Sequence, residues 1–487
     1  MNFYRNHWTI SRYPDTERIE NLSVNFWEDA PEKSLPIDEG TSFLDQFKNL
    51  HKIVPLQPMY HIGNDSENCD FADVIMGGKN VYLSTTIMDT VENVAYSAFC
   101  YPRATDVYNS FLACQWSTNI YMSGRVTNSH NIFYSRYISD SANIWFSTNL
   151  IGCSECIGCH DLQNQKYCIG NTALEKSIYE IEKKKILQDK KKFMDFYLHI
   201  TTRPMVNIAS ENVTGNAIIK SHNIENGGWI NNMHDCRNIW IGEGGIDGSY
   251  HIYDSIDIGG RKTEDVYWWV GIGAGSTKIF CSSQITDCFS IYYSYFLDHC
   301  SYCIGCIGLM NKSYCILNKQ YTKEEWEILA EKIFASMESD GTLGEFFPAS
   351  MNPFYFNDTL AYLIDDSFTQ EEIEAEWYLW RGEPIRADIP EGMRVVKNSE
   401  LDQFQGFCSI RHPEWNEGSM GMDSSLRQND GTRWSEWYID PAIMNVVISD
   451  EKWNYYRIVK MEYDFLMKHA LPLPTLHWLD RMKMGFQ

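Results

Sequence analysis

Two blocks of cysteines are the residues whose types and spacing could do chemistry in this chain. The blocks are Cys153, Cys156, Cys159, Cys168 and Cys300, Cys303, Cys306, Cys315. Both follow the pattern C-S-x-C-I-G-C-x-x-L-x-N-x-x-Y-C-I, and each cysteine of the second block lies 147 positions after its counterpart, as from Cys153 to Cys300. Because Leu, Asn and Tyr match as well, we interpret the two blocks as an internal duplication.

Each block supplies four thiolates, enough for a tetrahedral zinc ion or an Fe–S cluster. The alternative is a metal-free thiol core, because free cysteine is among the most buried residue types. Cys156 and Cys168 are separated by one period of the short repeat that precedes the block, and we expect them to take the position that Asn takes in earlier repeats. The residues alone leave zinc, Fe–S and no metal open. His160 and His299 flank the blocks, and we interpret both as surface histidines.

This short repeat underlies each half of the chain. Six similar pentads begin with Asn or Asp and a β-branched residue, at 80–84, 93–97, 106–110, 119–123, 131–135 and 143–147. Their β-branched positions recur at a spacing of 12 or 13, and we expect Ile157 and Ile169 to continue this ladder. A second ladder lies six positions later, at Ile87, Cys100, Ala113, Val126, Ile138 and Leu150. The second half repeats the first ladder at Ile239, Ile252, Val266, Ile279, Ile291, Ile304 and Ile316.

A short fixed period indicates a stacked fold, and pentads of β-branched and aromatic residues favour strands. We therefore predict a mainly β protein with two β-solenoid (β-helix) halves. One coil could take a single period of about 12 residues, with two strands and two turns, or two periods of about 25 residues. A β-meander is a third arrangement. The recurring Asn suits a left-handed turn position, where stacked amides could hydrogen-bond from coil to coil and stabilise the stack.

A helix is expected to close each half. Thr172–Glu175 and Thr322–Glu325 both fit the capping box, in which Thr and Glu satisfy each other's backbone N–H groups. Apolar residues follow at helical spacing, at Ile178, Ile181 and Ile186 and at Trp326, Ile328, Leu329 and Ile333. Such helices would cover the open ends of the stacks, where unpaired strand edges invite aggregation. The lysines at 183–185 and 190–192 are interpreted as a solvated face or a contact with the protein's own acidic surface.

The repeats stop at about Gly344, and helical patterns follow at 368–377 and 453–470. We predict a small α-rich C-terminal docking domain with an extended tail at 471–474. The predicted divisions are an N-terminal arm (1–67), solenoid half 1 (68–172), a capping helix and linker (173–203), solenoid half 2 (204–318), a capping helix (319–342) and the C-terminal domain (343–487).

Composition narrows the function. With 41 Lys and Arg against 65 Asp and Glu, the net charge is −24, which makes nucleic acid an unlikely partner because phosphate binding needs a basic surface. No apolar run is long enough to span a membrane, and no Sec signal is visible. The expected location is the cytoplasm, or a particle assembled there, where the 15 cysteines stay reduced.

The chain resembles a family of uncharacterised, cysteine-rich tandem-repeat proteins predicted from uncultured bacteria and some phages. The resemblance is carried by segments 43–48, 314–325, 344–348 and 471–474, with Val54-Pro55, Asn352-Pro353 and Tyr456-Arg-Ile. That family has Cys where this chain has Asn in the repeats, and zinc-ribbon-like Cys pairs near its ends. Here Cys408 is the only cysteine after Cys315. The resemblance implies no activity.

No nucleophile elbow, zinc-protease or P-loop motif is present. We therefore expect a non-enzymatic structural protein, a rigid solenoid scaffold that docks other protein subunits, as in a phage virion, with the cysteine blocks stabilising the solenoid ends. The alternative is a carbohydrate-binding or carbohydrate-cleaving β-helix, which would use carboxylates near the aromatic cluster Tyr267-Trp268-Trp269.

Overall fold

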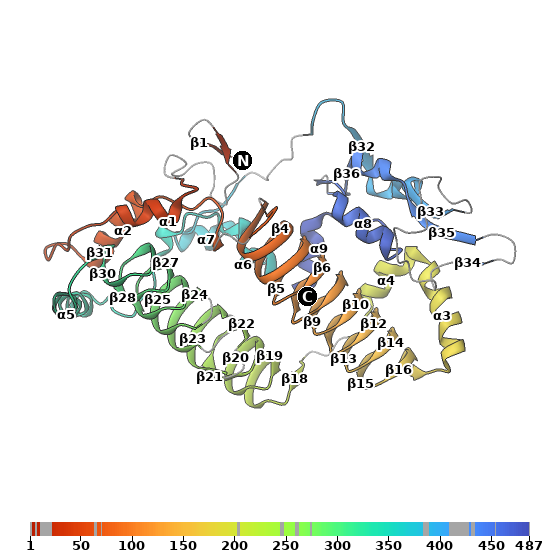
Figure 1. Ribbon diagram of the computed structural model, residues 1–487, viewed down its shortest axis with the longest axis horizontal. Helices are drawn as coiled ribbons and strands as arrows, with labels where there is room; N and C mark the ends of the chain where they lie inside the picture. Colours follow the sequence, from red (N-terminus) through yellow and green to blue (C-terminus); the bar gives the residue numbers. More distant parts are fainter. Residues whose placement is uncertain are drawn as a thin grey trace. The chain divides into compact units, whose positions relative to one another are not determined.

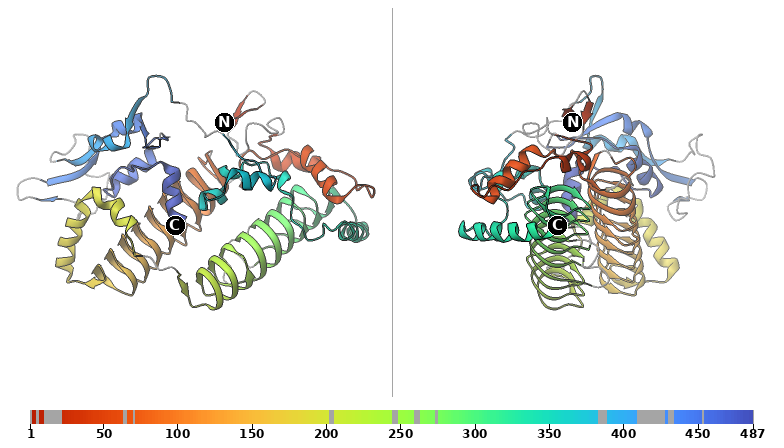
Figure 2. Two further views of the ribbon diagram at one scale, coloured as in Figure 1. Left: turned by 180° about the vertical axis from the view of Figure 1, so that it is seen from behind. Right: turned by 60° about the vertical axis from the view of Figure 1, so that its left-hand side comes forward.

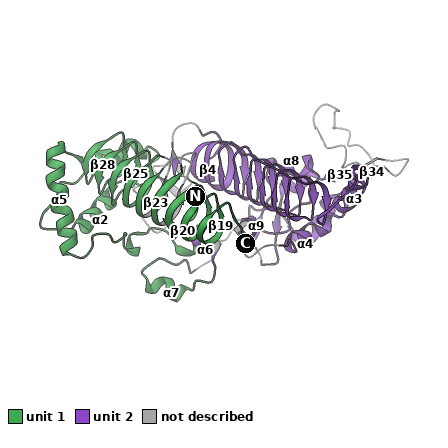
Figure 3. Ribbon diagram, turned by 90° about the horizontal axis from the view of Figure 1, so that it is seen from below, with its two compact units in different colours: residues 1–58, 203–359, 367–380 green, residues 59–202, 360–366, 381–487 purple. Residues whose placement is uncertain are grey.

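The protein divides into two compact units, each containing one β-solenoid (Figure 3). The computed structural model describes residues 2–4, 7–9, 22–62, 66–69, 71–201, 205–243, 248–258, 263–272, 275–382, 389–408, 428–429, 434–452 and 454–486. Unit 1 comprises residues 1–58, 203–359 and 367–380, and unit 2 comprises 59–202, 360–366 and 381–487. The predicted mainly β fold with two solenoid halves is confirmed.

The solenoid of unit 2 alternates between two parallel faces (Figure 1). It begins with β3 (His61–Ile62) and the long β4 (Phe71–Ala95), which pairs with the first strand of each face. One face contains β5 (Ala98–Tyr101), β7 (Phe111–Cys114), β9 (Gly124–Thr127), β11 (Arg136–Ser139), β13 (Thr148–Ile151) and β15 (His160–Gln163). The other contains β6 (Thr105–Tyr108), β8 (Thr118–Tyr121), β10 (His130–Phe133), β12 (Ala142–Trp145), β14 (Ser154–Ile157), β16 (Lys166–Ile169) and the terminal β17 (Thr172–Ala173).

The solenoid of unit 1 starts with longer strands and ends in the same four-residue pattern (Figure 2). Its first strands are β18 (Asn207–Ile208), β19 (Glu211–Ile219), β20 (His222–Asn231), β21 (Met233–Arg237), β22 (Trp240–Glu243), β23 (Ser249–Ile258), β24 (Glu264–Ile272) and β25 (Thr277–Thr286). The last coils contain β26 (Phe289–Tyr292), β27 (Tyr295–Asp298), β28 (Ser301–Ile304), β29 (Ile307–Met310), β30 (Ser313–Ile316) and β31 (Lys319–Gln320).

Strand register decides the length of a coil. Ile132 lies beside Ile120 on one side and Ile144 on the other, all in parallel register. One coil therefore takes a single period of the sequence repeat, which rules out the coil of two periods and the antiparallel meander. The two predicted ladders of the first half point inward as far as Ile144 and Leu150, and Ile132 of one ladder and Ile138 of the other have no exposed surface.

The predicted ladders are wrong by one residue at their ends. Ile144 pairs with Cys156, and Cys156 pairs with Cys168, while Ile157 lies beside Trp145 on the outer surface. The corresponding residues of the second half behave in the same way, so that Cys303 and Cys315 continue the inward ladder and Ile304 and Ile316 face outward. Adjacent residues of a strand point to opposite faces. One full coil after Ile144 or Ile291 the chain places a Cys, not the following Ile, beside that inward residue.

Two further positions differ from the expected ladder. Ile239 is fully buried but lies at a turn, and the ladder runs from Cys236 to Ile252 instead. The cysteines also do not occupy the Asn position, which Glu155 holds in the first block. The side chains of Met233 and Ile239 occupy the space beside Gly242, so that a Cβ at this position would collide with both.

The Asn residues form the predicted stack. Asn119, Asn131 and Asn143 adopt positive φ, and each donates a side-chain hydrogen bond to the next, ending on Glu155 at 2.7 Å. A second run from Asn68 ends on Asp106, which accepts from Asn93. A carboxylate cannot donate onward. Lys468 fills this gap, with Nζ 3.4 Å from Asp106 and 3.2 Å from the Asn119 Oδ1 atom.

The last coil of each solenoid is covered by its own chain. β17 and β31 fold back and pair antiparallel with β16 and β30. Asn171 accepts from the His160 N–H and donates to the His160 carbonyl, and Asn318 does the same to Ile307. Each amide thereby replaces the backbone of a following coil, which protects the strand edge that the helices were expected to cover.

The two helices lie beside these last coils. α5 (Lys323–Ser339) begins with the predicted Thr322–Glu325 capping box and packs Trp326 against Tyr302 and Tyr314. The capping box at Thr172 is wrong: Thr172 belongs to β17, and α3 (Lys176–Gln188) begins after Glu175, which makes no side-chain cap. When the two halves are aligned on their cysteine blocks, Thr322 corresponds to Glu175 and not to Thr172.

The buried face of α3 also differs from the prediction. Ile178 and Ile181 are 49% and 57% exposed, whereas Tyr179, Lys183 and Leu187 are buried at every fourth position. On α5, Ile328 is likewise exposed, and Trp326 and Ile333 are buried as expected. Four of the six lysines contact the protein's own acidic groups: Lys183, Lys185, Lys191 and Lys192.

Unit 1 includes the N-terminal segment. Phe26 packs against Phe296, and Phe47 packs against Tyr295 and Phe347. The elements are β1 (Asn2–Tyr4), β2 (His7–Thr9), α1 (Phe26–Asp29), η2 (Ala30–Glu32), α2 (Phe43–Ile53), η4 (Ala349–Met351), η5 (Phe356–Asp358) and α7 (Gln370–Ala375). Helix α7 lies in the predicted 368–377 segment and begins with a capping box at Thr369.

The C-terminal part in unit 2 mixes helices with two small sheets. Its helical elements are α6 (Leu360–Ile364), η6 (Asn398–Phe404), η8 (Pro441–Asn445), α8 (Lys460–Lys468) and α9 (Trp478–Phe486). Its strands are β32 (Arg394–Lys397), β33 (Gln405–Cys408), β34 (Gln428–Asn429), β35 (Trp434–Ile439), β36 (Val446–Ser449) and β37 (Tyr455–Tyr456). The helix expected at 453–470 is thus shorter, with a strand before it. Segment 471–474 is not a tail, since Leu471 and Leu473 are buried and α9 follows.

Among the described residues, no helix combines the length and the apolar character needed to cross a membrane.

Candidate functional site: two thiol clusters

The eight predicted thiols occupy two kinds of position in the last coils. Cys156 and Cys168 lie in the inward ladder that Ile120, Ile132 and Ile144 form in earlier coils. Cys153 and Cys159 lie at the turns between strands. The second block has the same arrangement, with Cys303 and Cys315 in the ladder and Cys300 and Cys306 at turns. All eight are buried, with at most 2% of their surface exposed.

The turn cysteines take over a position that serine holds in earlier coils. Ser147 donates its hydroxyl to the Trp145 carbonyl two residues before it, and accepts from the Cys159 N–H one coil later. The Cys159 thiol repeats the first of these bonds, donating to the Ile157 carbonyl at 3.4 Å. Cys153 does the same to Ile151, following Ser141. At the turns, a thiol therefore does the structural work of a hydroxyl.

A ninth cysteine, Cys288, belongs to the second cluster and is absent from the predicted set. It lies at a turn one coil before Cys300, whose N–H donates to its sulfur at 3.2 Å. The signal was present in the sequence, because Cys288 precedes Cys300 by one repeat period. Cys288 has no cysteine counterpart in the first half, where the corresponding residue is Ser141, so a comparison of the two blocks does not identify it.

The thiols contact one another through a central sulfur. In the first cluster, the Cys156 thiol neighbours those of Cys159 and Cys168. In the second, Cys303 contacts the thiols of three other cysteines, Cys300, Cys306 and Cys315. Cys300 also contacts Cys288. The duplicated ladder position thus places one cysteine of each cluster at the centre of the others.

These contacts favour the thiolate form of Cys159 in the first cluster and of Cys300 and Cys315 in the second. The hydrogen bond from Cys156 lowers the pKa of Cys159 to about 7 and raises the pKa of Cys156 itself. Hydrogen bonds from Cys288 and Cys303 lower the pKa of Cys300, while the pKa of Cys303 is raised by its three thiol neighbours. A thiolate is the form of cysteine that binds metals and attacks electrophiles.

A metal site would need a different description of these thiols from a thiol core. A zinc ion needs four sulfurs about 2.3 Å from one central point, whereas in a thiol core the sulfurs contact one another directly. Within the ranges that the structure describes, no three or more His, Cys, Asp or Glu side chains are arranged to hold a metal ion. Zinc ligation and an Fe–S cluster both stay predictions.

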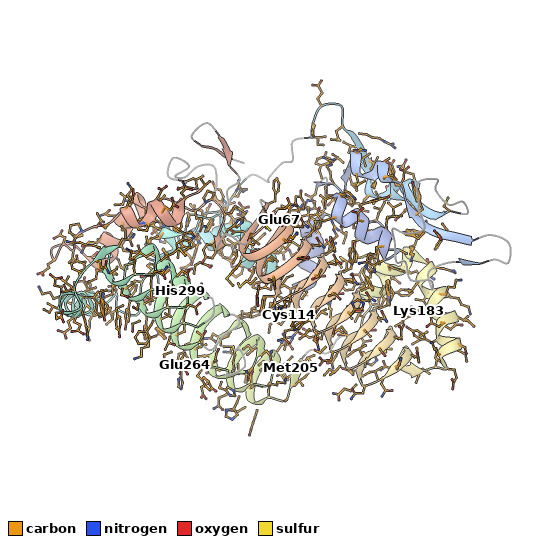
Figure 4. All side chains as sticks on the ribbon, viewed as in Figure 1. Glu67, Cys114, Lys183, Met205, Glu264 and His299 are labelled. Atoms are coloured by element: carbon orange, nitrogen blue, oxygen red, sulfur yellow. The ribbon has the colours of Figure 1, made fainter. Side chains whose placement is uncertain are left out.

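The flanking histidines bind carboxylates. His160 Nδ1 lies 3.2 Å from Asp161, and His299 Nδ1 lies 2.8 Å from Asp298. The Asp298 carboxylate raises the pKa of His299. His299 is 58% exposed at its side chain and is labelled in Figure 4. The interpretation of both as surface histidines is confirmed.

Conservative substitutions distinguish the thiol core from a metal site. We expect Cys153→Ser and Cys156→Val each to change the free energy of unfolding by less than about 1.5 kcal/mol, because Ser and a β-branched residue occupy those positions one coil earlier. We expect Cys156→Ser to cost about 1–3 kcal/mol, since it buries a hydroxyl in an apolar ladder. Urea denaturation of the purified variants measures these differences.

The metal hypothesis predicts a large loss for Cys153→Ser and Cys156→Val as well. Both Cys153→Ser and Cys156→Val would remove a ligand, so metal content measured by elemental analysis would fall with each. A loss of several kcal/mol in both, together with lost zinc, would contradict the thiol core.

Comparisons with known proteins add no function. No protein-family model matches the chain, and the search of curated proteins finds no match. Among solved structures, a putative acetyltransferase from Desulfovibrio desulfuricans G20 is 9% identical, with 62% of this chain and 80% of that chain covered, at a TM-score of 0.11. A likeness at that score carries no argument about fold or activity.

Proposed function

We propose that this β-solenoid protein is a non-enzymatic scaffold, and that unit 1 docks an amphipathic helix of a partner protein on its outer face. The observation that supports this is an internal comparison. Both solenoids carry an outward row of aromatic residues, one position after the inward ladder. The row of unit 2 is Tyr108, Tyr121, Phe133 and Trp145, and the row of unit 1, called the aromatic row below, is Tyr253, Tyr267, Phe280 and Tyr292.

In unit 2, helices of the same chain cover this row. Phe465 of α8 packs on Tyr108 with ring centroids 4.4 Å apart, and His469 packs on Phe133. Phe193 of α4 (Phe193–Leu198) packs on Trp145. A row of ring side chains at one-coil spacing is therefore a surface on which helices bind.

In unit 1, α5 covers one end of the aromatic row. Phe334 of α5 packs on Tyr292 with ring centroids 5.1 Å apart, and Ile304 and Ile316 beyond it are fully buried. Further along the row Tyr267 is 38% exposed. Exposed aromatic side chains are enriched at protein interfaces, so this stretch is the counterpart of the surface that α8 occupies in unit 2.

Site-specific photo-crosslinking tests the proposal. A photoreactive phenylalanine analogue is placed at Tyr267 and, as a control, at the exposed turn residue Asn311. We expect a crosslinked protein from position 267 alone, with the crosslink in a helical segment identified by mass spectrometry. In a complex reconstituted from the two purified proteins, Tyr267→Asp should weaken binding at least tenfold, because it places a charge in an aromatic contact.

Equal crosslinking from positions 267 and 311, or unchanged affinity in Tyr267→Asp, would contradict the docking surface. The virion location and the absence of enzymatic activity stay predictions. So does the carbohydrate alternative, because the side chains of Trp268 and Trp269 lie outside the described residues.

A further inference from the structure

Three consecutive lysines between α3 and α4 have different surroundings. Lys191 and Lys192 are exposed, and they pair with Asp402 at 2.7 Å and Asp189 at 3.0 Å. Lys190 is buried, with 8% of its surface exposed. The three form η3 (Lys190–Lys192) and differ chiefly in which way the short helix turns them.

The amine of Lys190 lies between aromatic rings. Its Nζ is 4.8 Å from the ring centroid of Phe193 and 5.5 Å from that of Trp437. Lysine is almost never buried without a carboxylate partner, yet none of the ion pairs between described residues involves Lys190. The nearby carboxylates serve other cations: Asp402 and Asp189 hold its two neighbours, and Glu155 binds Lys183.

Burial has a chemical consequence for this amine. Desolvation lowers the pKa of Lys190 to about 7, because the charged form loses its hydration. Near neutral pH about half of the Lys190 side chains are then uncharged, against roughly one in a thousand or fewer for an ordinary lysine. An uncharged lysine amine is a nucleophile toward carbonyl carbon.

A small cavity lies beside Lys190. Its volume of about 10 Å³ suits a group the size of one water molecule. Phe407, which is 39% exposed, places its rim at the surface. The lining combines apolar with cationic side chains, from Lys183, Lys184, Leu187, Gln188, Lys190, Phe407, Trp437 and Ala470.

We propose that Lys190 is a carbonyl-binding amine that forms a Schiff base with a small α-oxo acid at this cavity. The amine attacks the carbonyl carbon to give a carbinolamine, which loses water as the C=N bond forms. The step is reversible and needs no oxidant or reductant. The carbonyl oxygen enters the cavity, and Lys184 in its lining supplies positive charge for the carboxylate.

The charge around the cavity favours an anionic carbonyl compound. Lys183, labelled on α3 in Figure 4, lies 2.9 Å from Glu155, which offsets its charge. Lys184 is half-exposed and lines the cavity beside it. We therefore assign Lys184 as the residue that selects a carboxylate.

Reductive trapping tests the assignment on the full-length protein. The protein is incubated with glyoxylate and cyanoborohydride at pH 7, and adducts are mapped by mass spectrometry of peptides. We expect at least ten times more adduct at Lys190 than at Lys191 or Lys192, which share its helix and are the internal controls. Lys190→Met, which keeps a side chain of similar length without the amine, should show no such adduct and a melting temperature no lower than that of the unchanged protein, because it buries no unpaired charge.

Two outcomes would overturn the proposal. The first is equal or greater labelling at Lys191 and Lys192, which would make Lys190 a structural cation held between two rings. The second concerns the carboxylate: Lys184→Gln should lower trapping of glyoxylate at Lys190 at least threefold and leave trapping of formaldehyde, an uncharged aldehyde, unchanged. An equal effect on both compounds would contradict selection of an α-oxo acid.

Discussion

Replacing Ile132 by aspartate is expected to unfold the solenoid of unit 2. Ile132 has no exposed surface and lies in register between Ile120 and Ile144. The substitution removes about 1.5–3 kcal/mol of apolar burial and places a carboxyl group where no donor faces it, which costs several kcal/mol more. That sum is comparable with the whole stability of a typical domain, about 5–15 kcal/mol. Circular dichroism and thermal denaturation of the purified variant measure the loss.

Two variants separate burial from a general effect of substitution. Ile132→Val keeps the β-branched shape and should cost about 0.5–1.5 kcal/mol. Thr127→Asp places the same new charge on the outer side of β9, where Thr127 is half-buried, and should leave the solenoid folded. A folded Ile132→Asp protein with an unchanged melting temperature would contradict the inward ladder.

Glu462→Gln is expected to release the C-terminal helices from the solenoid of unit 2. Glu462 of α8 and Arg481 of α9 form an ion pair at 2.6 Å with side chains 0% and 1% exposed. Arg481 also lies over the ring of Tyr96, which follows β4, with its Cζ 5.0 Å from the centroid. Breaking a buried pair leaves the remaining charge buried without a partner, which typically costs about 3–5 kcal/mol. Hydrogen exchange of α8 and α9, with urea denaturation, measures the effect.

An exposed pair in the same helix provides the control. Lys460 and Asp464 of α8 lie 2.6 Å apart, with side chains 78% and 54% exposed. Lys460→Met should change stability by less than about 1 kcal/mol, because water and salt screen exposed pairs. The double variant Glu462→Leu with Arg481→Met should recover most of the loss, since it removes both charges. If Glu462→Gln cost no more than Lys460→Met, the pair would not anchor the helices.

Much of the solenoid follows from local repetition. A nearly constant repeat period brings the same position of each coil into register, so the two inward ladders and the Asn stack could be predicted from residue types alone. The capping box at Thr322 could be predicted for the same reason, because its residues interact with one another. The ends of the ladders could not be predicted in this way. Cys156 and Ile157 are adjacent and both apolar, and only the strand pairing shows which of the two side chains points inward.

The thiol clusters illustrate the same division. Duplication and spacing identified eight of the nine cysteines, and their burial agrees with the expected structural unit in the last coils. The central positions of Cys156 and Cys303 depend on where the turns place their neighbours, and sequence spacing does not contain that geometry. The role of the turn cysteines as substitutes for serine became visible once hydrogen bonds joined consecutive coils.

The sequence by itself determined the repeat period, the two halves and most of the residues that face each core, because these depend on contacts one coil apart. The tertiary structure decided which distant segments bind each solenoid: α2 on unit 1 through Phe47, and α8 on unit 2 through Phe465. It also decided that Lys190 is buried while Lys191 is exposed. Such contacts join residues far apart along the chain and leave no period in the sequence, so the chain must fold before they exist.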